Sequence, residues 1–179
     1  MYKVLTPNRL SQLLTPLSLR GALATKQSHC IYLFSVIVFT KPMTAKAIEW
    51  LDNELRILDQ SKLPHRQIFI DLSDYQDVVS AIKTMQIRGA PAIGVAAAYG
   101  IALGAQKIEA ENKDHFFDEF GKILEAFATS RPTAANLFRA IDRMKKAARG
   151  KDVSEIKKSL IDEAKQIHHE EIEATTQLS

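Results

Sequence analysis

The sequence predicts a mainly α-helical domain with a small antiparallel β-sheet near its N-terminal side, an α+β fold. Residues 48–72 contain short apolar segments of strand length, separated by turn-forming residues. From residue 73 onward, apolar residues recur at the three- and four-residue spacing of amphipathic helices. Hydrophobic residues make up 46% of the 179 and charged residues 25%, a composition typical of a globular protein with one buried core.

Residues 1–42 differ from the rest and are expected to lie outside this domain, which we assign to residues 43–179. They hold five of the 24 basic side chains and none of the 21 acidic ones. Their apolar run, residues 30–40, is about half of the ~20 residues that a membrane-spanning helix needs. It fits either a signal-peptide core or an added leader with Met43 as the older start. We favour the leader, because an orderly pattern begins just after Met43.

The body of the chain does not predict a nucleic-acid surface, a membrane span or a metal site. Its clustered basic residues are expected to form the solvated face of one helix. They are Arg139, Arg143, Lys145, Lys146 and Arg149. His168 and His169 are adjacent, so a helix points them about 100° apart, and we expect surface positions for both. The single cysteine, Cys30, allows no intrachain disulfide and is compatible with a reducing compartment.

Three strands are expected, at residues 48–51, 54–59 and 67–72. A helix then begins at Ser73 or Asp74. Its predicted buried residues are Val78, Val79, Ile82 and Met85.

Four further helices are expected, at residues 91–107, 115–128, 132–149 and from 152 to the end of the chain. The last begins with a capping box at residues 152–155. The helix at 115–128 has a predicted apolar stripe of Phe116, Phe117, Phe120, Ile123, Leu124 and Phe127.

The segment around Arg88 and Gly89 has the composition of an anion-binding junction. Both residues stand directly before a helix that is expected to begin at Pro91, because proline suits the first helical position. A helix start offers unpaired N–H groups and a partial positive charge. Gly89 lets a ligand approach the backbone, and Arg88 adds a permanently charged, forked donor. A phosphate group is the kind of ligand that this combination favours.

A second junction repeats this pattern at Arg131 and Pro132, with a helix expected to begin at the proline. Each arginine alone is equally compatible with a surface ion pair. Two such junctions in one small domain favour a shared anion site.

The helix at 91–107 also carries a stripe of small residues at four-residue spacing, namely Ala92, Ala96, Gly100 and Gly104. Glycine in a helix interior costs about 1 kcal/mol relative to alanine. Close packing of another backbone is the favoured explanation, and a ligand on the stripe is the alternative.

At these two junctions the sequence resembles the methylthioribose-1-phosphate isomerases, in the superfamily of the initiation factor 2B alpha, beta and delta subunits. The first motif is RGAPAIGVAAAYG at residues 88–100, and the second is SRPTAANL at 130–137, followed by AIDRM at 140–144. The resemblance covers about residues 43–175.

The resemblance implies an aldose–ketose isomerase of methionine salvage, a route of amino-acid biosynthesis. Such an enzyme converts 5-methylthioribose 1-phosphate to 5-methylthioribulose 1-phosphate, needs no cofactor or metal, is cytoplasmic, and forms a homodimer at full length. The positions that match the family's substrate contacts, chiefly to the phosphate, are Arg88, Gly89, Ala90 and Arg131.

The family's catalytic cysteine and aspartate lie in a C-terminal Rossmann-like domain, which we expect to be absent because the chain ends at Ser179. No catalytic residue is therefore assigned. Asp142 and Glu163 are expected to be ordinary exposed helix residues. We expect a fragment that is inactive alone, and whose small-residue stripe and last helix expose apolar surface. The resemblance thus implies an isomerase lineage and leaves the activity of this chain open.

Two alternatives belong to other classes. One is a non-catalytic regulatory module related to the initiation factor 2B subunits, which generally lack the first motif. The other is a ribose-bisphosphate isomerase, which shares the chemistry but takes another substrate.

Overall fold

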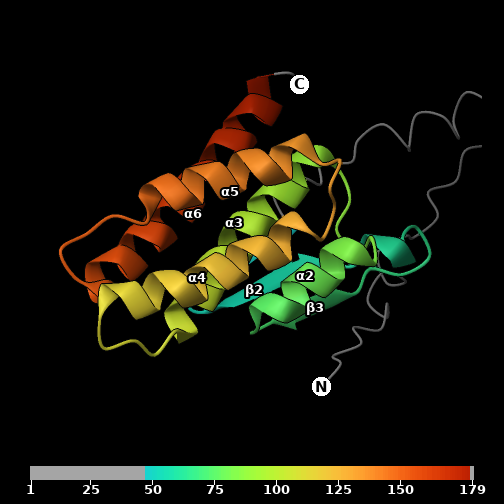
Figure 1. Cartoon of the computed structure of the whole chain (residues 1–179). Coiled ribbons are helices and arrows are strands. Elements are labelled where there is room, and N and C mark those ends of the chain that lie inside the picture. The colour runs from blue at the N-terminus through green and yellow to red at the C-terminus, as the bar shows by residue number, and fades with distance from the viewer. Residues whose placement is uncertain (1–46, 178–179) are drawn as a thin grey trace, which may run out of the picture. The chain divides into compact units, whose positions relative to one another are not determined.

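The computed structural model describes residues 47–177, so the predictions for residues 1–42 lie outside the described residues. A small sheet comes first in the chain, and five α-helices follow (Figure 1). The predicted combination of a mainly helical body and a small antiparallel sheet is confirmed.

The sheet has three antiparallel strands in the order β1-β2-β3, with β1 at Ile48–Leu51, β2 at Glu54–Leu58 and β3 at Phe69–Leu72. Asp52 and Asn53 join β1 to β2 with positive φ angles of 30° and 82°, as a two-residue hairpin requires. Alternate residues of β2 face the core, where Leu55 and Ile57 are fully buried.

Three helices begin at side-chain caps that satisfy free backbone N–H groups. These are α2 (Tyr75–Lys83) after Asp74, α4 (Lys113–Ala128) after Asn112, and α6 (Val153–Gln177) after Asp152. Of the two predicted cap residues Ser73 and Asp74, Asp74 caps α2. Asp152 caps α6 as predicted, but the Glu155 carboxylate accepts from the N–H of Lys151 and not from that of Asp152, so the capping box is only half formed.

Two predicted apolar positions are wrong. Helix α2 ends at Lys83, and Met85 follows it with a φ of 59° and 42% exposure instead of facing the core. Phe117 is 42% exposed, because it lies one residue beside the buried stripe of α4 that Phe116 and Phe120 form. Met85 lies two residues beyond the end of its helix, and Phe117 lies at the edge of a buried face.

Helix α3 (Ala90–Lys107) forms the centre of the domain and contacts β1, β2 and all four other α-helices. Every residue from Ile93 to Ala105 is buried. The prediction that its small-residue stripe lies exposed is therefore wrong: the other elements of the domain already cover this helix.

Gly100 and Gly104 of the stripe make room for side chains of a neighbouring helix, whereas we expected the close approach of a neighbouring backbone. A Cβ atom added at Gly100 would lie 2.5 Å from Cζ of Phe127, and one added at Gly104 would lie 2.9 Å from Cδ1 of Ile123. Both neighbours belong to α4. These glycines let α4 pack closely on α3, and no ligand is needed to explain them.

Helix α5 (Ala135–Ala147) packs on α3 and on α6. Arg143 of α5 donates to Glu163 of α6, with 2.7 Å between Nε and Oε1, and to both carboxylate oxygens of Glu170. The side chains of Arg143 and Glu163 are 27% and 25% exposed. Arg143 therefore does not belong to the solvated face predicted for it, and Glu163 is not the ordinary exposed residue that we predicted; the two side chains join the helices instead.

Candidate functional site

The first predicted junction lies between α2 and α3, and its backbone is fixed by hydrogen bonds. The N–H groups of Gln86 and Ile87 donate to the carbonyl of Ala81, at 3.0 Å and 3.3 Å. The side chain of Ile87 is buried in the core at 1% exposure. Arg88, the next residue, is exposed, and its Nε donates to the carbonyl of Met85 at 3.2 Å. The core thus holds the segment while the guanidinium faces solvent.

Gly89 occupies a backbone conformation that favours glycine. It is the N-cap of α3, with φ 88° and ψ 133°. A Cβ atom added there would meet nothing within 4 Å. The space beside the glycine is therefore open, and the positive φ alone disfavours other residues.

Helix α3 begins at Ala90, one residue before the predicted start at Pro91, and both residues are exposed. Pro91 keeps its predicted place in the first turn.

The second junction differs from its prediction. Residues 131–134 form a turn closed by the N–H of Ala134 and the carbonyl of Arg131 at 3.1 Å. Helix α5 begins at Ala135, so Pro132 lies in the turn and not at the first helical position. The turn places Arg131 half-buried, four residues before the helix.

The beginnings of the two helices lie against each other. A Cβ atom added at Gly94, in the second turn of α3, would lie 3.1 Å from the carbonyl oxygen of Asn136, in the first turn of α5. Glycine at this position permits that approach. The fold therefore brings the helix starts of the two predicted motifs together, although about 40 residues separate them in sequence.

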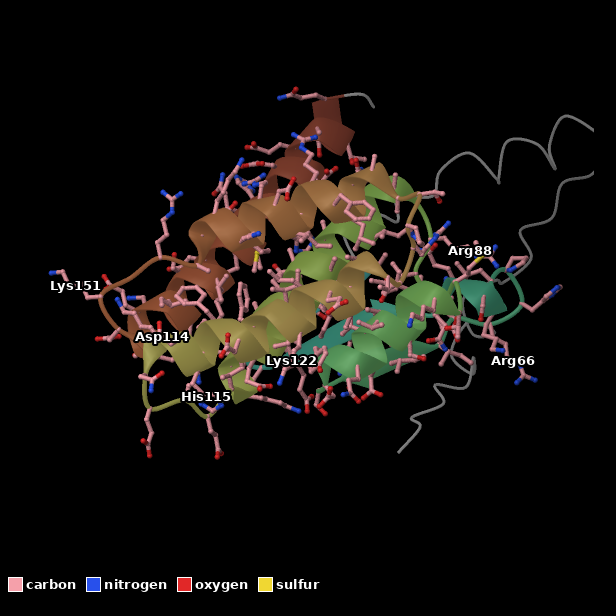
Figure 2. All side chains as sticks on the ribbon, viewed as in Figure 1. Arg66, Arg88, Asp114, His115, Lys122 and Lys151 are labelled. Carbon is pink, nitrogen blue, oxygen red and sulfur yellow. The ribbon has the colours of Figure 1, made fainter. Side chains whose placement is uncertain are left out.

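These two helix starts lack the side-chain caps that the other three α-helices have. Gly89 precedes α3 and Ala134 precedes α5, and neither offers a side-chain hydrogen bond. Residues 84–94 and 129–137 also contain no acidic side chain. Figure 2 shows Arg88 at the end of the domain where Arg66 lies, away from the end that carries His115 and Lys151. Helix starts without side-chain caps, close to arginines in segments that contain no acidic residue, favour the binding of an anion.

A cluster that the sequence did not predict joins β1, α3 and α6. The ring of Trp50 stacks on Tyr99 at 5.1 Å between centroids, and the Tyr99 hydroxyl lies 3.0 Å from Nδ1 of His168. Burial raises the pKa of Tyr99 to about 12 and lowers the pKa of His168. The surface position predicted for His168 is wrong, whereas His169 is exposed as predicted. The aromatic residues at 50 and 99 were visible in the sequence, but their partners were not.

Over residues 47–177, no group of three or more His, Cys, Asp or Glu side chains is arranged to hold a metal ion. In the same part of the chain, no helix has both the length and the apolar character needed to cross a membrane. Asp142 is exposed as predicted.

The matching sequence family is the Initiation factor 2 subunit family, whose model aligns with residues 86–179, just over half of the chain. A methylthioribose-1-phosphate isomerase from Dehalococcoides mccartyi is 53% identical over 135 residues, which cover 75% of this chain and 40% of that protein. One from Geotalea uraniireducens is 46% identical over 134 residues, with coverages of 73% and 39%. The chain thus spans about 40% of the length of these curated relatives.

Two solved structures share the fold. The 5-methylthioribose 1-phosphate isomerase from Pyrococcus horikoshii OT3 is 36% identical with a TM-score of 0.66, covering 72% of this chain and 38% of that one. The translation initiation factor eIF-2B subunit delta from A. fulgidus is 38% identical with a TM-score of 0.67, covering 71% and 37%. Sequence and fold agree: the chain belongs to the Initiation factor 2 subunit family and, as its motifs predicted, is similar to the methylthioribose-1-phosphate isomerases.

Proposed function

We propose that residues 47–177 hold the phosphate end of a sugar phosphate in a methylthioribose-1-phosphate isomerase. The substrate is 5-methylthioribose 1-phosphate and the product 5-methylthioribulose 1-phosphate. The observation that carries the proposal is the contact between Gly94 and Asn136, because it puts two uncapped helix starts, each behind an arginine, beside each other. The isomerase names of the relatives supply the substrate.

Each residue has a role in this proposal. Arg88 and Arg131 pair with the phosphate dianion, since a guanidinium offers two parallel N–H donors to such a group. Gly89 and Ala90 bring the backbone and the positive end of α3 to the phosphate. The phosphate contacts orient the sugar and do not themselves move a proton.

The proton transfer between the two sugar carbons needs an acid and a base at the sugar. We assign neither to residues 47–177, since two half-buried groups there that could titrate, His168 and Glu163, have structural partners. His168 bonds Tyr99, and Glu163 pairs with Arg143. We therefore expect this chain to bind the sugar phosphate without converting it.

Isothermal titration calorimetry of the 179-residue chain with 5-methylthioribose 1-phosphate tests the binding. Arg88→Ala and Arg131→Ala should each weaken it about ten- to a hundred-fold, as expected for losing a charge-assisted hydrogen bond. Arg149→Ala is the matched control, because Arg149 is also exposed but follows the opposite end of α5. Equal affinities for all three variants would refute the assignment. Phosphorus NMR on the same samples tests turnover, and conversion by the chain alone would overturn the non-catalytic part.

The regulatory alternative is favoured by one comparison, the similarity to the eIF-2B subunit delta from A. fulgidus. A regulatory module of that kind has no need to bind the sugar phosphate through Arg88. Binding that is lost in Arg88→Ala would therefore support the isomerase assignment. The ribose-bisphosphate alternative predicts that ribose 1,5-bisphosphate binds more tightly than 5-methylthioribose 1-phosphate in the same titration.

A further inference from the structure

We propose that Gln86 is a positioning residue of the anion site, held in turn by the buried carboxylate of Asp59. Gln86 fixes the segment that presents Arg88 and the start of α3. The inference rests on the proposed function, because it concerns how the same site is pre-organised.

Gln86 lies two residues before Arg88, and both its backbone and its side chain are engaged. Its N–H donates to the carbonyl of Ala81 at 3.0 Å, and its carbonyl accepts from the N–H of Gln60 at 3.0 Å. Its side-chain Nε2 lies 3.5 Å from Oδ2 of Asp59, a long hydrogen bond. Gln86 therefore ties the junction to the end of α2 on one side and to the turn after β2 on the other.

Asp59 is a carboxylate with only 3% exposure, in a place where an unpaired charge would be strongly destabilising. Its Oδ1 accepts from the N–H of Ser61 at 2.9 Å and from the Ser61 hydroxyl at 2.6 Å. These bonds cap the short 3-10 helix η2 (Gln60–Lys62). Gln60 is the first residue of η2 and the donor to Gln86, so Asp59 holds Gln86 through the turn as well as through the amide.

This anchoring matters because the guanidinium of Arg88, which we expect to bind the anion, is on the surface. Arg88 is exposed, and its Nε donates to the carbonyl of Met85, which lies in the same segment. A segment that is free to move would have to be ordered when the ligand binds, and that entropy loss weakens affinity. A segment already fixed by Gln86 avoids most of this loss. Loosening it should weaken anion binding without changing any charge at the site.

The test is a titration of the full chain with 5-methylthioribose 1-phosphate, and with inorganic phosphate as the minimal probe. Gln86→Met keeps the size of the side chain and removes the amide, and we expect affinity to fall about three- to ten-fold. Gln106→Met is the matched control. Gln106 is also half-buried, and its Nε2 donates to the carbonyl of Lys157 at 3.1 Å, but it lies at the far end of α3. We expect its affinity to match the original chain.

Variants of Asp59 separate positioning from folding. Asp59→Leu removes every acceptor and should weaken binding as Gln86→Met does. Asp59→Asn keeps Oδ1 as the acceptor for Ser61, and its Nδ2 can donate to Oε1 of Gln86 once the Gln86 amide turns over, so we expect rescue to within about two-fold of the original affinity. Hydrogen exchange of residues 84–90 should become faster in Gln86→Met and stay unchanged in Gln106→Met.

The Arg88→Ala variant distinguishes a failure of the positioning role from a failure of the proposed function. If Gln86 acts through Arg88, then Gln86→Met should weaken binding much less in the Arg88→Ala background than in the original chain. If Gln86→Met binds as tightly as Gln106→Met while Arg88→Ala weakens binding, the positioning role is overturned and the proposed function stands. If Arg88→Ala has no effect, the proposed function fails and the positioning role fails with it. A loss that is fully additive with Arg88→Ala would overturn the role of Gln86 in positioning Arg88.

Discussion

Replacing Gly100 by alanine puts the packing of α3 to a direct test. Alanine ordinarily stabilises a helix interior by about 1 kcal/mol relative to glycine. At Gly100, however, the added Cβ would lie 2.5 Å from Cζ of Phe127 and 3.0 Å from Cγ1 of Val78. Both neighbours are fully buried, so neither side chain can turn outward.

Packed carbon atoms stay about 3.5–4.0 Å apart, so the Phe127 ring would have to move by about 1 Å. Overpacking of this kind costs about 1–3 kcal/mol. That cost offsets or exceeds the gain in helix propensity, and we expect Gly100→Ala to leave the free energy of unfolding unchanged or lower it by up to about 2 kcal/mol.

Gly121→Ala is the matched control, because Gly121 lies inside α4, is exposed, and has nothing within 4 Å of an added Cβ. It should raise the free energy of unfolding by up to about 1 kcal/mol. Both variants share the propensity gain, so their difference of about 1–3 kcal/mol reports the overlap alone. Urea unfolding followed by circular dichroism measures it. Equal stabilisation by both substitutions would refute the packing of α4 on Gly100, and Gly100→Ala should cost less in a Phe127→Leu background.

Three further predictions concern the junction, the half-buried His168 and the ion pairs. Gly89→Ala should lower the free energy of unfolding by about 1–3 kcal/mol, because φ is 88° and strain is the only cost; an unchanged urea midpoint would contradict this. Burial lowers the pKa of His168, so the unfolded chain binds this proton more tightly than the folded chain and stability should fall as the pH drops below about 6.5. His168→Gln should flatten this slope in unfolding curves between pH 5 and 7, and the exposed His169→Gln should not. Arg143→Met should lower stability at pH 7 by about 1 kcal/mol after allowance for solvent screening. The Arg143 hydrogen bond lowers the pKa of Glu170 to about 2, so the stability difference between the original chain and Arg143→Met should shrink as the pH falls from about 4.5 to 2. A difference that stays constant over this range would show that the pair of Arg143 and Glu170 contributes nothing.

The sequence predicted those features that depend on neighbouring residues. The caps at Asp74 and Asp152 are local hydrogen bonds, and each lies within three residues of its partner. The strands at 48–51 and 54–58 follow from alternation and a tight turn. Arg88 and Gly89 stand at the beginning of a helix because the local signals there, glycine followed by alanine and proline, agree with each other.

The features that the sequence missed depend on contacts between distant segments. Pro132 is compatible with a turn as well as with a helix start, and in the fold α5 begins only at Ala135, next to the close approach of Asn136 to Gly94. His168 shows no sign of burial in its own helix, because its partner Tyr99 is 69 residues away. Gln86 stands two residues before the first motif and had no predicted role, since its contacts to Gln60 and Asp59 come from the turn after β2.

Helix α3 connects the local features with the contacts between distant segments, because its glycines serve different neighbours. Gly100 and Gly104 belong to the small-residue stripe, and Gly94 lies outside it. Gly100 and Gly104 admit side chains of α4 and so belong to the core. Gly94 admits the backbone of Asn136, and that approach sets how near the start of α5 comes to the start of α3. In the sequence, the small-residue stripe and the two arginine junctions are separate features. In the fold, one helix serves both: Gly100 and Gly104 permit its close packing with α4, and Gly94 permits the approach of α5 that brings the two junctions together, so small residues in α3 support the core and the proposed anion site alike.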